Sequence, residues 1–162
     1  MHSKTRQFTT RKATLGDMEF VKSCLIDSWS EHALNTPHLL NKDRLNAFES
    51  EDFYIKSIAN DEGCFLIAEH DGKPVGLVVA YITKLSYFFI HPQSIYIDDI
   101  YVVDDFRRAG VAKILMDSVE EFAKAKGIRR LDNRVYSYNI PMQKLLTKLG
   151  YSSPFATWIK TI

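Results

Sequence analysis

The sequence has little of several features that define common functional classes. Only two of its 162 residues are cysteines, Cys24 and Cys64. Neither has a neighbour at metal-ligand spacing, so we expect buried reduced thiols rather than a disulfide, a nucleophile or a metal site. No apolar run is long enough to cross a bilayer, and no apolar signal core opens the chain. The formal net charge of +1 provides no broad basic field for nucleic acid. We therefore expect a cytoplasmic protein without a metal, a membrane segment or a nucleic-acid partner.

Glycine-rich phosphate loops are also missing. The Walker A string Gly-x-x-x-x-Gly-Lys-Ser/Thr does not occur in the sequence. The dinucleotide fingerprint needs three glycines at the start of a helix, whereas the turn at residues 107–112 contains one, Gly110. The sequence therefore does not predict a nicotinamide site or a P-loop.

What the chain does contain is a regular alternation of strands and helices. A hydrophobic content of 46% over 162 residues is enough for the core of one domain, which we expect to span residues 1–162. The periodicity of apolar residues and the turn signals predict strands at 8–13, 64–69, 74–82, 95–103, 130–135 and 155–161, and helices at 18–30, 42–59, 112–126 and 140–149. This order indicates an α/β fold.

One junction in this order is suited to binding a phosphate. The apolar strand at residues 95–103 passes through Arg107-Arg108-Ala109-Gly110-Val111-Ala112 into a helix. The start of a helix leaves main-chain N–H groups without partners and carries the positive end of the helix dipole. Gly110 and Ala112 would let a pyrophosphate approach these groups closely. The alternative interpretation is an ordinary helix start with two solvated arginines.

The same turn resembles the acetyl-CoA signature of the GNAT superfamily of N-acetyltransferases, Gln/Arg-x-x-Gly-x-Gly/Ala. Three further segments resemble motifs of that family in the same order: 11–17 (Arg-x-Ala-x-x-x-Asp), 71–76 (Asp-Gly-x-x-Val-Gly) and 139–151 (the Asn-x-x-Ala-x-x-x-Tyr-x-x-x-Gly-Phe/Tyr block). The resemblance implies the GNAT fold, α/β (α+β), with a mixed central sheet of six to seven strands flanked by about four helices. It also implies acetyl-CoA as co-substrate, no metal, and by analogy a homodimer.

The resemblance assigns cofactor-binding roles to particular residues. The main chain of Ile100, Tyr101 and Val102 would pair with the pantetheine arm like an added strand. The pyrophosphate would lie at the turn formed by Arg107, Arg108, Ala109, Gly110, Val111 and Ala112. Asn139 matches an asparagine that reaches the pantetheine or the nearby phosphate region. Its position before Ile140-Pro141 also suits a simple helix cap.

Two acids interrupt the apolar strand and are candidates for the chemistry. Asp98 and Asp99 lie where a central strand does not hold carboxylates without a partner or a purpose, and strand alternation would place them on opposite faces. They resemble the acidic pair of diamine acetyltransferases, which suggests Asp98 as the base, acting directly or through water, and Asp99 as the residue that binds a cationic substrate. The alternative is a pair of salt bridges to Arg129, Arg130 or Arg134.

The sequence also departs from the family pattern. Leu146 stands where the family commonly has a tyrosine that protonates the leaving thiolate. A thiol with a pKa near that of cysteine, about 8.5, leaves tolerably without such an acid.

The resemblance and the acidic pair together imply a function: transfer of an acetyl group to a small-molecule amine, such as a polyamine or an aminoglycoside. The alternatives are a protein or peptide amine as acceptor, or a weakly active module that binds acyl-CoA.

Overall fold

The computed structural model describes residues 7–41, 44, 51–60 and 62–161. Its main elements are β1 (Thr9–Lys12), α1 (Met18–Asn35), α2 (Glu51–Ala59), β2 (Cys64–His70), β3 (Lys73–Lys84), β4 (Gln93–Val102), α3 (Val111–Ala125), β5 (Leu131–Asn133) and α4 (Ile140–Lys148). Short 3-10 turns precede α1 and α3. The predicted α/β order as far as the last helix, and the four helices, are confirmed in the described residues. Most of the first half of the helix predicted at 42–59 lies outside them.

The strands form one mixed sheet in the order β1-β2-β3-β4-β5. The pairings from β1 to β4 are antiparallel, and β4 pairs with β5 in parallel. The mixed character of the sheet agrees with the prediction, but its five strands correct the expected six to seven.

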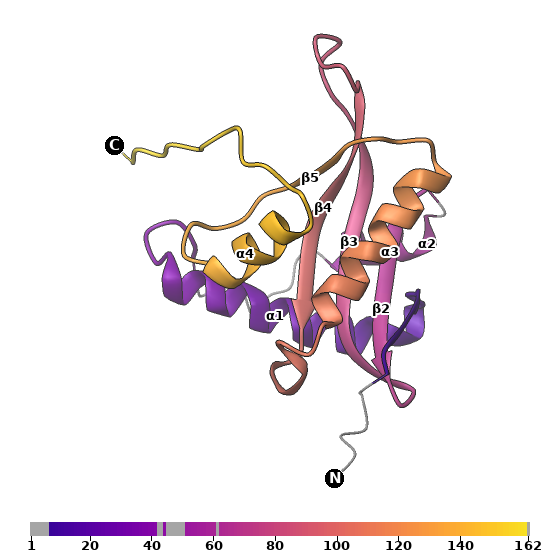
Figure 1. Cartoon of the computed structure of the whole chain (residues 1–162). Coiled ribbons are helices and arrows are strands. Elements are labelled where there is room, and N and C mark those ends of the chain that lie inside the picture. The colour runs from indigo at the N-terminus through magenta and orange to yellow at the C-terminus, as the bar shows by residue number, and fades with distance from the viewer. Residues whose placement is uncertain (1–6, 42–43, 45–50, 61, 162) are drawn as a thin grey trace.

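The missing strand is the predicted one at residues 155–161. These residues have no ladder partner and lead away from the sheet (Figure 1), and Phe155 and Trp158 are 71% and 93% exposed. A β-branched and aromatic pattern indicates that a segment can adopt extended backbone, but a strand also needs a neighbour for its N–H and C=O groups. Among the described residues none is in place for this segment.

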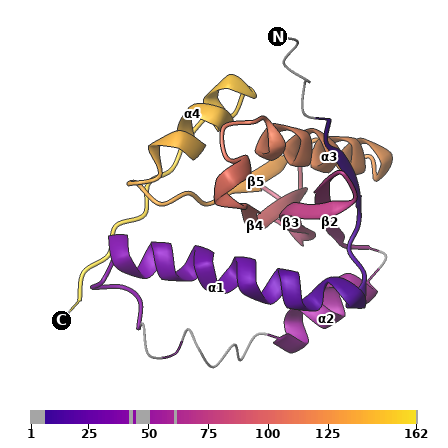
Figure 2. The same cartoon turned by 90° about the horizontal axis from the view of Figure 1, so that it is seen from below.

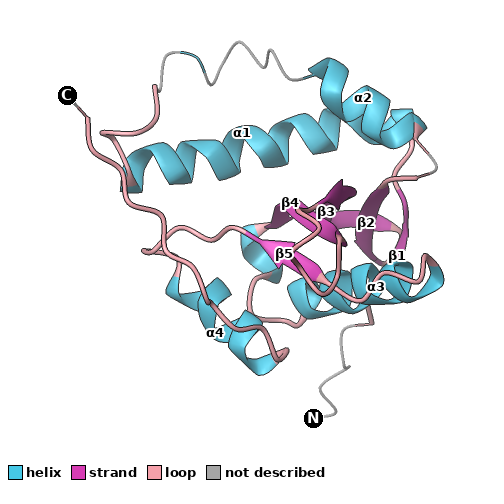
Figure 3. Ribbon diagram, turned by 90° about the horizontal axis from the view of Figure 1, so that it is seen from above, coloured by secondary structure: helices cyan, strands magenta, loops and turns pink. Residues whose placement is uncertain are grey.

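Helices cover both faces of the sheet. α1 and α2 lie on one face, and α3 and α4 lie on the other (Figures 2 and 3). The alternation along β3 divides the core accordingly: Leu77 and Val79 pack toward α1 and α2, whereas Val78 and Ala80 pack toward α3. The buried side of α3 repeats at helical spacing, through Val111, Leu115, Met116, Val119 and Ala123. Residues that alternate along the strands and residues at helical spacing therefore pack together in the layers on either side of the sheet.

Gly76 brings the start of α3 directly against the sheet. It pairs with Val102 across β3 and β4. A Cβ atom at this position would lie 2.8 Å from the Tyr101 carbonyl oxygen and 3.2 Å from Val111 Cγ1. Because Tyr101 and Val111 flank the junction between β4 and α3, the absence of a side chain at Gly76 determines how closely that junction packs.

We expect Gly76→Ala to lower the free energy of unfolding by about 1–3 kcal/mol, the usual cost of overpacking a dense core. Urea unfolding measures this loss. Gly16→Ala is the matched control, because its new Cβ would meet nothing nearer than Thr14 Oγ1 at 3.5 Å. Equal losses in the two variants would show that the close approach at Gly76 has no energetic consequence.

Candidate active site

β4 and β5 are neighbours at one side of the sheet, but they pair over only part of their length. β4 pairs with β3 from Gln93 to Val102, but β5 pairs with β4 only at Ile95, Tyr96 and Ile97. From residue 98 to residue 102, the other edge of β4 therefore has no strand beside it in the described part of the chain. Such an edge accepts an extended ligand through main-chain hydrogen bonds.

The register shows which main-chain groups face this edge. The Val103 N–H donates to the Val75 carbonyl at 3.0 Å, and hydrogen-bonded positions alternate along an antiparallel pair. Tyr101 therefore pairs with β3, whereas Ile100 and Val102 turn their N–H and C=O groups outward. The Val102 carbonyl accepts a hydrogen bond from Arg107 Nε at 3.2 Å, in agreement with this orientation. Of the three residues expected to bind the pantetheine arm, Ile100 and Val102 present the polar groups.

The turn before α3 has the geometry expected of an anion site. Gly110 is the N-cap of α3, with φ of 95°, and no side chain caps the helix start. The first N–H groups of α3, at Val111 and Ala112, therefore point outward at the positive end of the helix dipole. Arg108 also has a left-handed conformation, with φ of 64°, and its side chain is exposed. This arrangement fits a pyrophosphate held by main-chain donors.

Arg107 is held by carboxylates rather than free in solvent. Its guanidinium lies 3.1 Å from Glu31 Oε2 and 3.0 Å from Asp104 Oδ1, and it lies over the Tyr101 ring at 5.5 Å. These contacts connect the turn to α1. Arg107 and Arg108 are both exposed, and the ion pairs of Arg107 distinguish it from a purely solvated side chain. A pyrophosphate would compete with Glu31 and Asp104 for the Arg107 side chain.

We expect Gly110→Ala to weaken acetyl-CoA binding by about tenfold, because the added methyl group lies at the open helix start and the left-handed backbone disfavours a Cβ. Gly127→Ala is the matched control. It has φ of 68° and, like Gly110, open space around the new Cβ, so its backbone cost is similar. Isothermal titration with acetyl-CoA should show weaker binding only for Gly110→Ala. Equal affinities in both variants would remove the turn as the phosphate site.

Asn139 and Leu146 both have structural roles in α4. Asn139 is the N-cap, and its Oδ1 accepts a hydrogen bond from the Met142 N–H at 3.1 Å. The helix-cap interpretation is therefore confirmed, and contact of Asn139 with the cofactor stays a prediction. Leu146 packs against the cluster that faces α3. The Tyr138 hydroxyl is hydrogen-bonded to His32 of α1, so α1 also contacts the loop between β5 and α4.

A β-bulge in β4 changes the expected placement of the two aspartates. Val79 pairs with Asp99, but the next residue of β3, Ala80, pairs with Ile97. Asp98 is therefore an extra residue, and alternation is interrupted at that point. Tyr54, Tyr81 and Tyr96 each interact electrostatically with both aspartates. The prediction that Asp98 and Asp99 lie on opposite faces is wrong, because the bulge turns both toward one group of tyrosines.

Burial has different effects on the two carboxyl groups. Asp99 is half-buried and accepts a hydrogen bond from the Tyr54 hydroxyl at 2.9 Å. Desolvation raises the pKa of Asp99 to about 6, against the Tyr54 hydrogen bond, and the charge of Asp98 adds to the increase. Asp98 is open to solvent on one side. Partial loss of hydration also raises the pKa of Asp98, and the positive charge of Arg134 opposes this.

The alternative interpretation, a pair of salt bridges to Arg129, Arg130 or Arg134, is not what the structure shows. Among the described residues, neither Asp98 nor Asp99 has a basic side chain within ion-pair distance. Arg130 instead pairs with Asp132 at 2.9 Å and lies 4.6 Å from the centre of the Phe89 ring. Both carboxylates therefore remain available to a ligand.

Aromatic side chains from distant parts of the chain surround the acids. The rings of Tyr81 and Tyr96 lie 5.6 Å apart, and Tyr54 comes from α2. Farther along α1, His32 stacks on Tyr136 at 4.3 Å. We did not predict Tyr54 or His32 from the sequence, because neither belongs to a motif, and only packing brings Tyr54 to Asp99 of β4 and His32 to the loop between β5 and α4.

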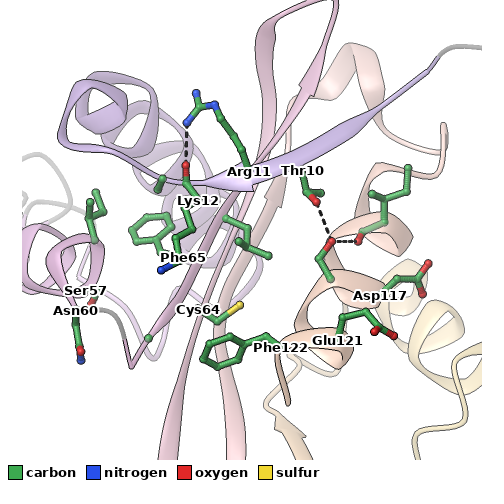
Figure 4. A pocket seen from close by; sticks show the side chains of 16 residues that line it. Thr10, Arg11, Lys12, Ser57, Asn60, Cys64, Phe65, Asp117, Glu121 and Phe122 are labelled. Atoms are coloured by element: carbon green, nitrogen blue, oxygen red, sulfur yellow. Dashed lines mark hydrogen bonds between the residues drawn. The ribbon is translucent and has the colours of Figure 1, made fainter. Parts of the chain in front are cut away.

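A cavity of about 440 Å³ lies elsewhere. It is lined by residues of β1, β2, α2 and α3, and Lys12, Cys64 and Phe122 lie around it (Figure 4). The strand order puts β1 and β2 at the opposite side of the sheet from β4 and β5. This cavity is therefore separate from the aspartates and from the turn before α3.

The cysteines, the absence of a metal cluster from the described residues and the helix lengths complete the description of the chain. Cys24 and Cys64 are free and buried, and burial raises the pKa of each thiol to about 12, which agrees with inert thiols. Within the described ranges, no group of three or more His, Cys, Asp or Glu side chains could hold a metal ion. Across those same ranges, no helix combines the length and the apolar character needed to cross a membrane.

Known proteins share both the family pattern and the fold. The model of the acetyltransferase (GNAT) family matches residues 28–151. No curated protein is similar enough in sequence to count as a match. Among solved structures, a mutant of the BH1408 protein from Bacillus halodurans has a TM-score of 0.84 at 16% identity, covering 95% of this chain and 99% of that one. A GCN5-related N-acetyltransferase from Ralstonia eutropha JMP134 has a TM-score of 0.76 at 19% identity, covering 96% and 99%.

A third structure is that of the aminoglycoside N-acetyltransferase AAC(6')-Iy in complex with CoA. It has a TM-score of 0.73 at 20% identity, and the match covers 100% of this chain and 99% of that one. The family model extends over most of the chain and includes the β4 edge, the aspartates and the turn before α3. The chain therefore belongs to the GNAT family of acetyltransferases, enzymes that use acetyl-CoA as their co-substrate.

Proposed function

We propose that the protein acetylates a small-molecule primary amine, of the kind that polyamines and aminoglycosides represent. The observation that carries this proposal is the bulge in β4, which turns Asp98 and Asp99 toward the same tyrosines. Carboxylates among aromatic rings are complementary to a cationic amine. The bulge lies directly beside the open edge of β4, where the acetyl thioester would arrive.

Two further observations support a small amine as acceptor. AAC(6')-Iy, which shares the fold, has been solved with a bisubstrate analogue that joins CoA to an acetylneamine. The acidic pair of the present chain, at Asp98 and Asp99, also resembles that of diamine acetyltransferases. Similarity to diamine acetyltransferases is part of this proposal.

Different residues of the site remove the proton, bind the positive charge and stabilise the developing negative charge. A primary amine with a pKa near 10.4 arrives protonated and must lose a proton before it attacks the acetyl carbon. Asp98 takes that proton, directly or through a water molecule, and Asp99 with Tyr54 binds the positive charge. One outward main-chain N–H group near Val102 donates to the thioester carbonyl as negative charge develops on its oxygen.

Departure of the thiol needs no dedicated acid in this scheme. Leu146 is an apolar residue that packs against the core, so the position that commonly holds a tyrosine has no proton to give. A thiol with a pKa of about 8.5 leaves as a thiolate near neutral pH and takes a proton from water. The start of α3, with its positive dipole end, holds the pyrophosphate in place during this step.

Release of free thiol from acetyl-CoA tests the proposed function. The acceptors to compare are spermidine, kanamycin, single amino acids and an unstructured peptide. We expect turnover with the small amines and little with the peptide. Turnover only with the peptide would favour a protein or peptide amine as the acceptor. Binding of acetyl-CoA without turnover of any amine would contradict the proposal.

The homodimer and the cytoplasmic location stay predictions. Light scattering of the purified chain measures its mass in solution, and a value twice that of the 18.7 kDa chain would confirm the dimer.

A further inference from the structure

Arg134 lies near the aspartates but forms no ion pair with either of them. Asn133, the last residue of β5, pairs with Ile97 of β4, so Arg134 directly follows the end of β5 and Asp98 directly follows Ile97 in β4. The positive charge of Arg134 acts on Asp98, Tyr81 and Tyr96. The arginine therefore faces the same space as the acids and the tyrosines.

The other well-placed arginines of the fold each have an acidic partner. Arg11 pairs with Asp17 at 2.7 Å, Arg107 with Glu31 at 3.1 Å and Arg130 with Asp132 at 2.9 Å. Within the residues that the structure describes, Arg134 has no ion pair and no hydrogen bond, and its side chain is exposed. A planar fork of N–H donors at the edge of the site is suited to a carboxylate of the ligand.

We propose that the acceptor is a diamino acid: an amine that carries a second cationic centre and a carboxylate. This inference rests on the proposed function and names the substrate class of that site. Asp98 and Asp99 match the two nitrogens, and Arg134 matches the carboxylate. A diamine without a carboxylate would satisfy the two acids but would bring positive charge against an unpaired guanidinium.

The transfer step is the same for any such acceptor. The nitrogen nearest Asp98 gives up one proton to the carboxylate or its water and forms a bond with the acetyl carbon. The bond between that carbon and sulfur breaks, and the thiolate leaves with the electron pair and takes up a proton. The products are one amide and one free thiol, so no oxidant or further reactant is needed.

Matched acceptors that differ only in the carboxylate test the inference. Ornithine is compared with 1,4-diaminobutane, and lysine with 1,5-diaminopentane, by free-thiol release. We expect kcat/KM to be about tenfold or more higher for the diamino acid of each pair, because its carboxylate gains a charge-assisted contact. In Arg134→Gln this ratio should fall toward one, and in Arg134→Glu the diamine should become the better acceptor.

Arg129→Gln is the control, since it removes the same charge from an exposed neighbouring position and should keep the ratio of the unaltered protein. Thermal melting verifies that each variant is folded. Equal kcat/KM values within both pairs, or a ratio that Arg134→Glu does not change, would overturn this inference and leave the proposed function intact. Absence of turnover with every small amine, while titration still shows acetyl-CoA binding, would overturn both.

Discussion

Asp98→Asn is expected to lower kcat for acetyl transfer by about 10²- to 10⁴-fold, the contribution typical of a positioned general base. The amide keeps the shape of the side chain but accepts no proton. Asp98 has no competing ion pair in the described part of the chain and is exposed. It can therefore reach a bound amine or a water molecule. The substitution therefore removes the carboxylate that takes the proton from the attacking amine in the proposed mechanism.

The pH profile distinguishes a lost base from a damaged site. With Asp98 as the base, kcat/KM rises as the pH increases through the pKa of its carboxyl group, and Asp98→Asn should lose that limb. Asp71→Asn is the control, because it removes the same charge from a hairpin turn whose side chain is 89% exposed. An unchanged rate in Asp98→Asn would exclude Asp98. A limb that disappears only in Asp99→Asn would instead assign the base to Asp99, whose pKa of about 6 suits that role.

Asp99→Asn is expected to change binding and stability in opposite directions. Loss of the carboxylate should raise KM for a cationic acceptor by about tenfold or more, because hydrogen bonds to charged groups contribute about 1.5–3 kcal/mol. The same substitution should raise the free energy of unfolding at pH 8 by about 1–2 kcal/mol, since the folded protein no longer holds a half-buried negative charge. The neutral amide can still accept the hydrogen bond from Tyr54.

The sign of the stability change follows from the direction of the pKa shift. The pKa of Asp99 is about 6 in the folded protein and 3.8 as its ordinary value, so the folded state binds the proton more tightly than the unfolded state does. The cost of the charge is absent below about pH 4 and is fully present above about pH 6, and stability falls as the pH rises between these limits.

Urea unfolding at pH 4 and pH 8 measures this effect. Asp99→Asn should match the unaltered protein at pH 4 and exceed it at pH 8, while the exposed Asp71→Asn should show no such difference. A variant less stable than the unaltered protein at both pH values would mean that Asp99 has a structural role. That outcome would contradict the assignment of Asp99 to the binding of the cationic acceptor.

Features that depend on local sequence were predicted well. The helical period of Val111, Leu115 and Val119 predicts α3, and the Asp71-Gly72 turn predicts the hairpin between β2 and β3. The turn before α3 was found from the single glycine at position 110, which has the left-handed backbone that favours glycine. In each case a few neighbouring residues carry the whole physical reason, so their letters are sufficient.

Features that depend on distant partners were not predicted. The strand expected at residues 155–161 is missing because a strand needs a neighbour, and no sequence pattern within one segment supplies it. Arg107 could not be assigned to Glu31 from the sequence, because these residues are 76 positions apart. Tyr54 reaches Asp99 only because α2 packs across the sheet.

The sequence by itself determined the family, the order of most elements, the glycine-containing turn before α3 and the presence of two acids in one strand, because each of these is encoded over a short span. Only the tertiary structure decided toward which face of the sheet the two carboxylates point. A single extra residue at Asp98, visible only in the pairing of β3 with β4, interrupts the period of two and turns both carboxylates toward the tyrosines. The register between strands, which is a property of two segments together, therefore shaped the proposed acceptor site.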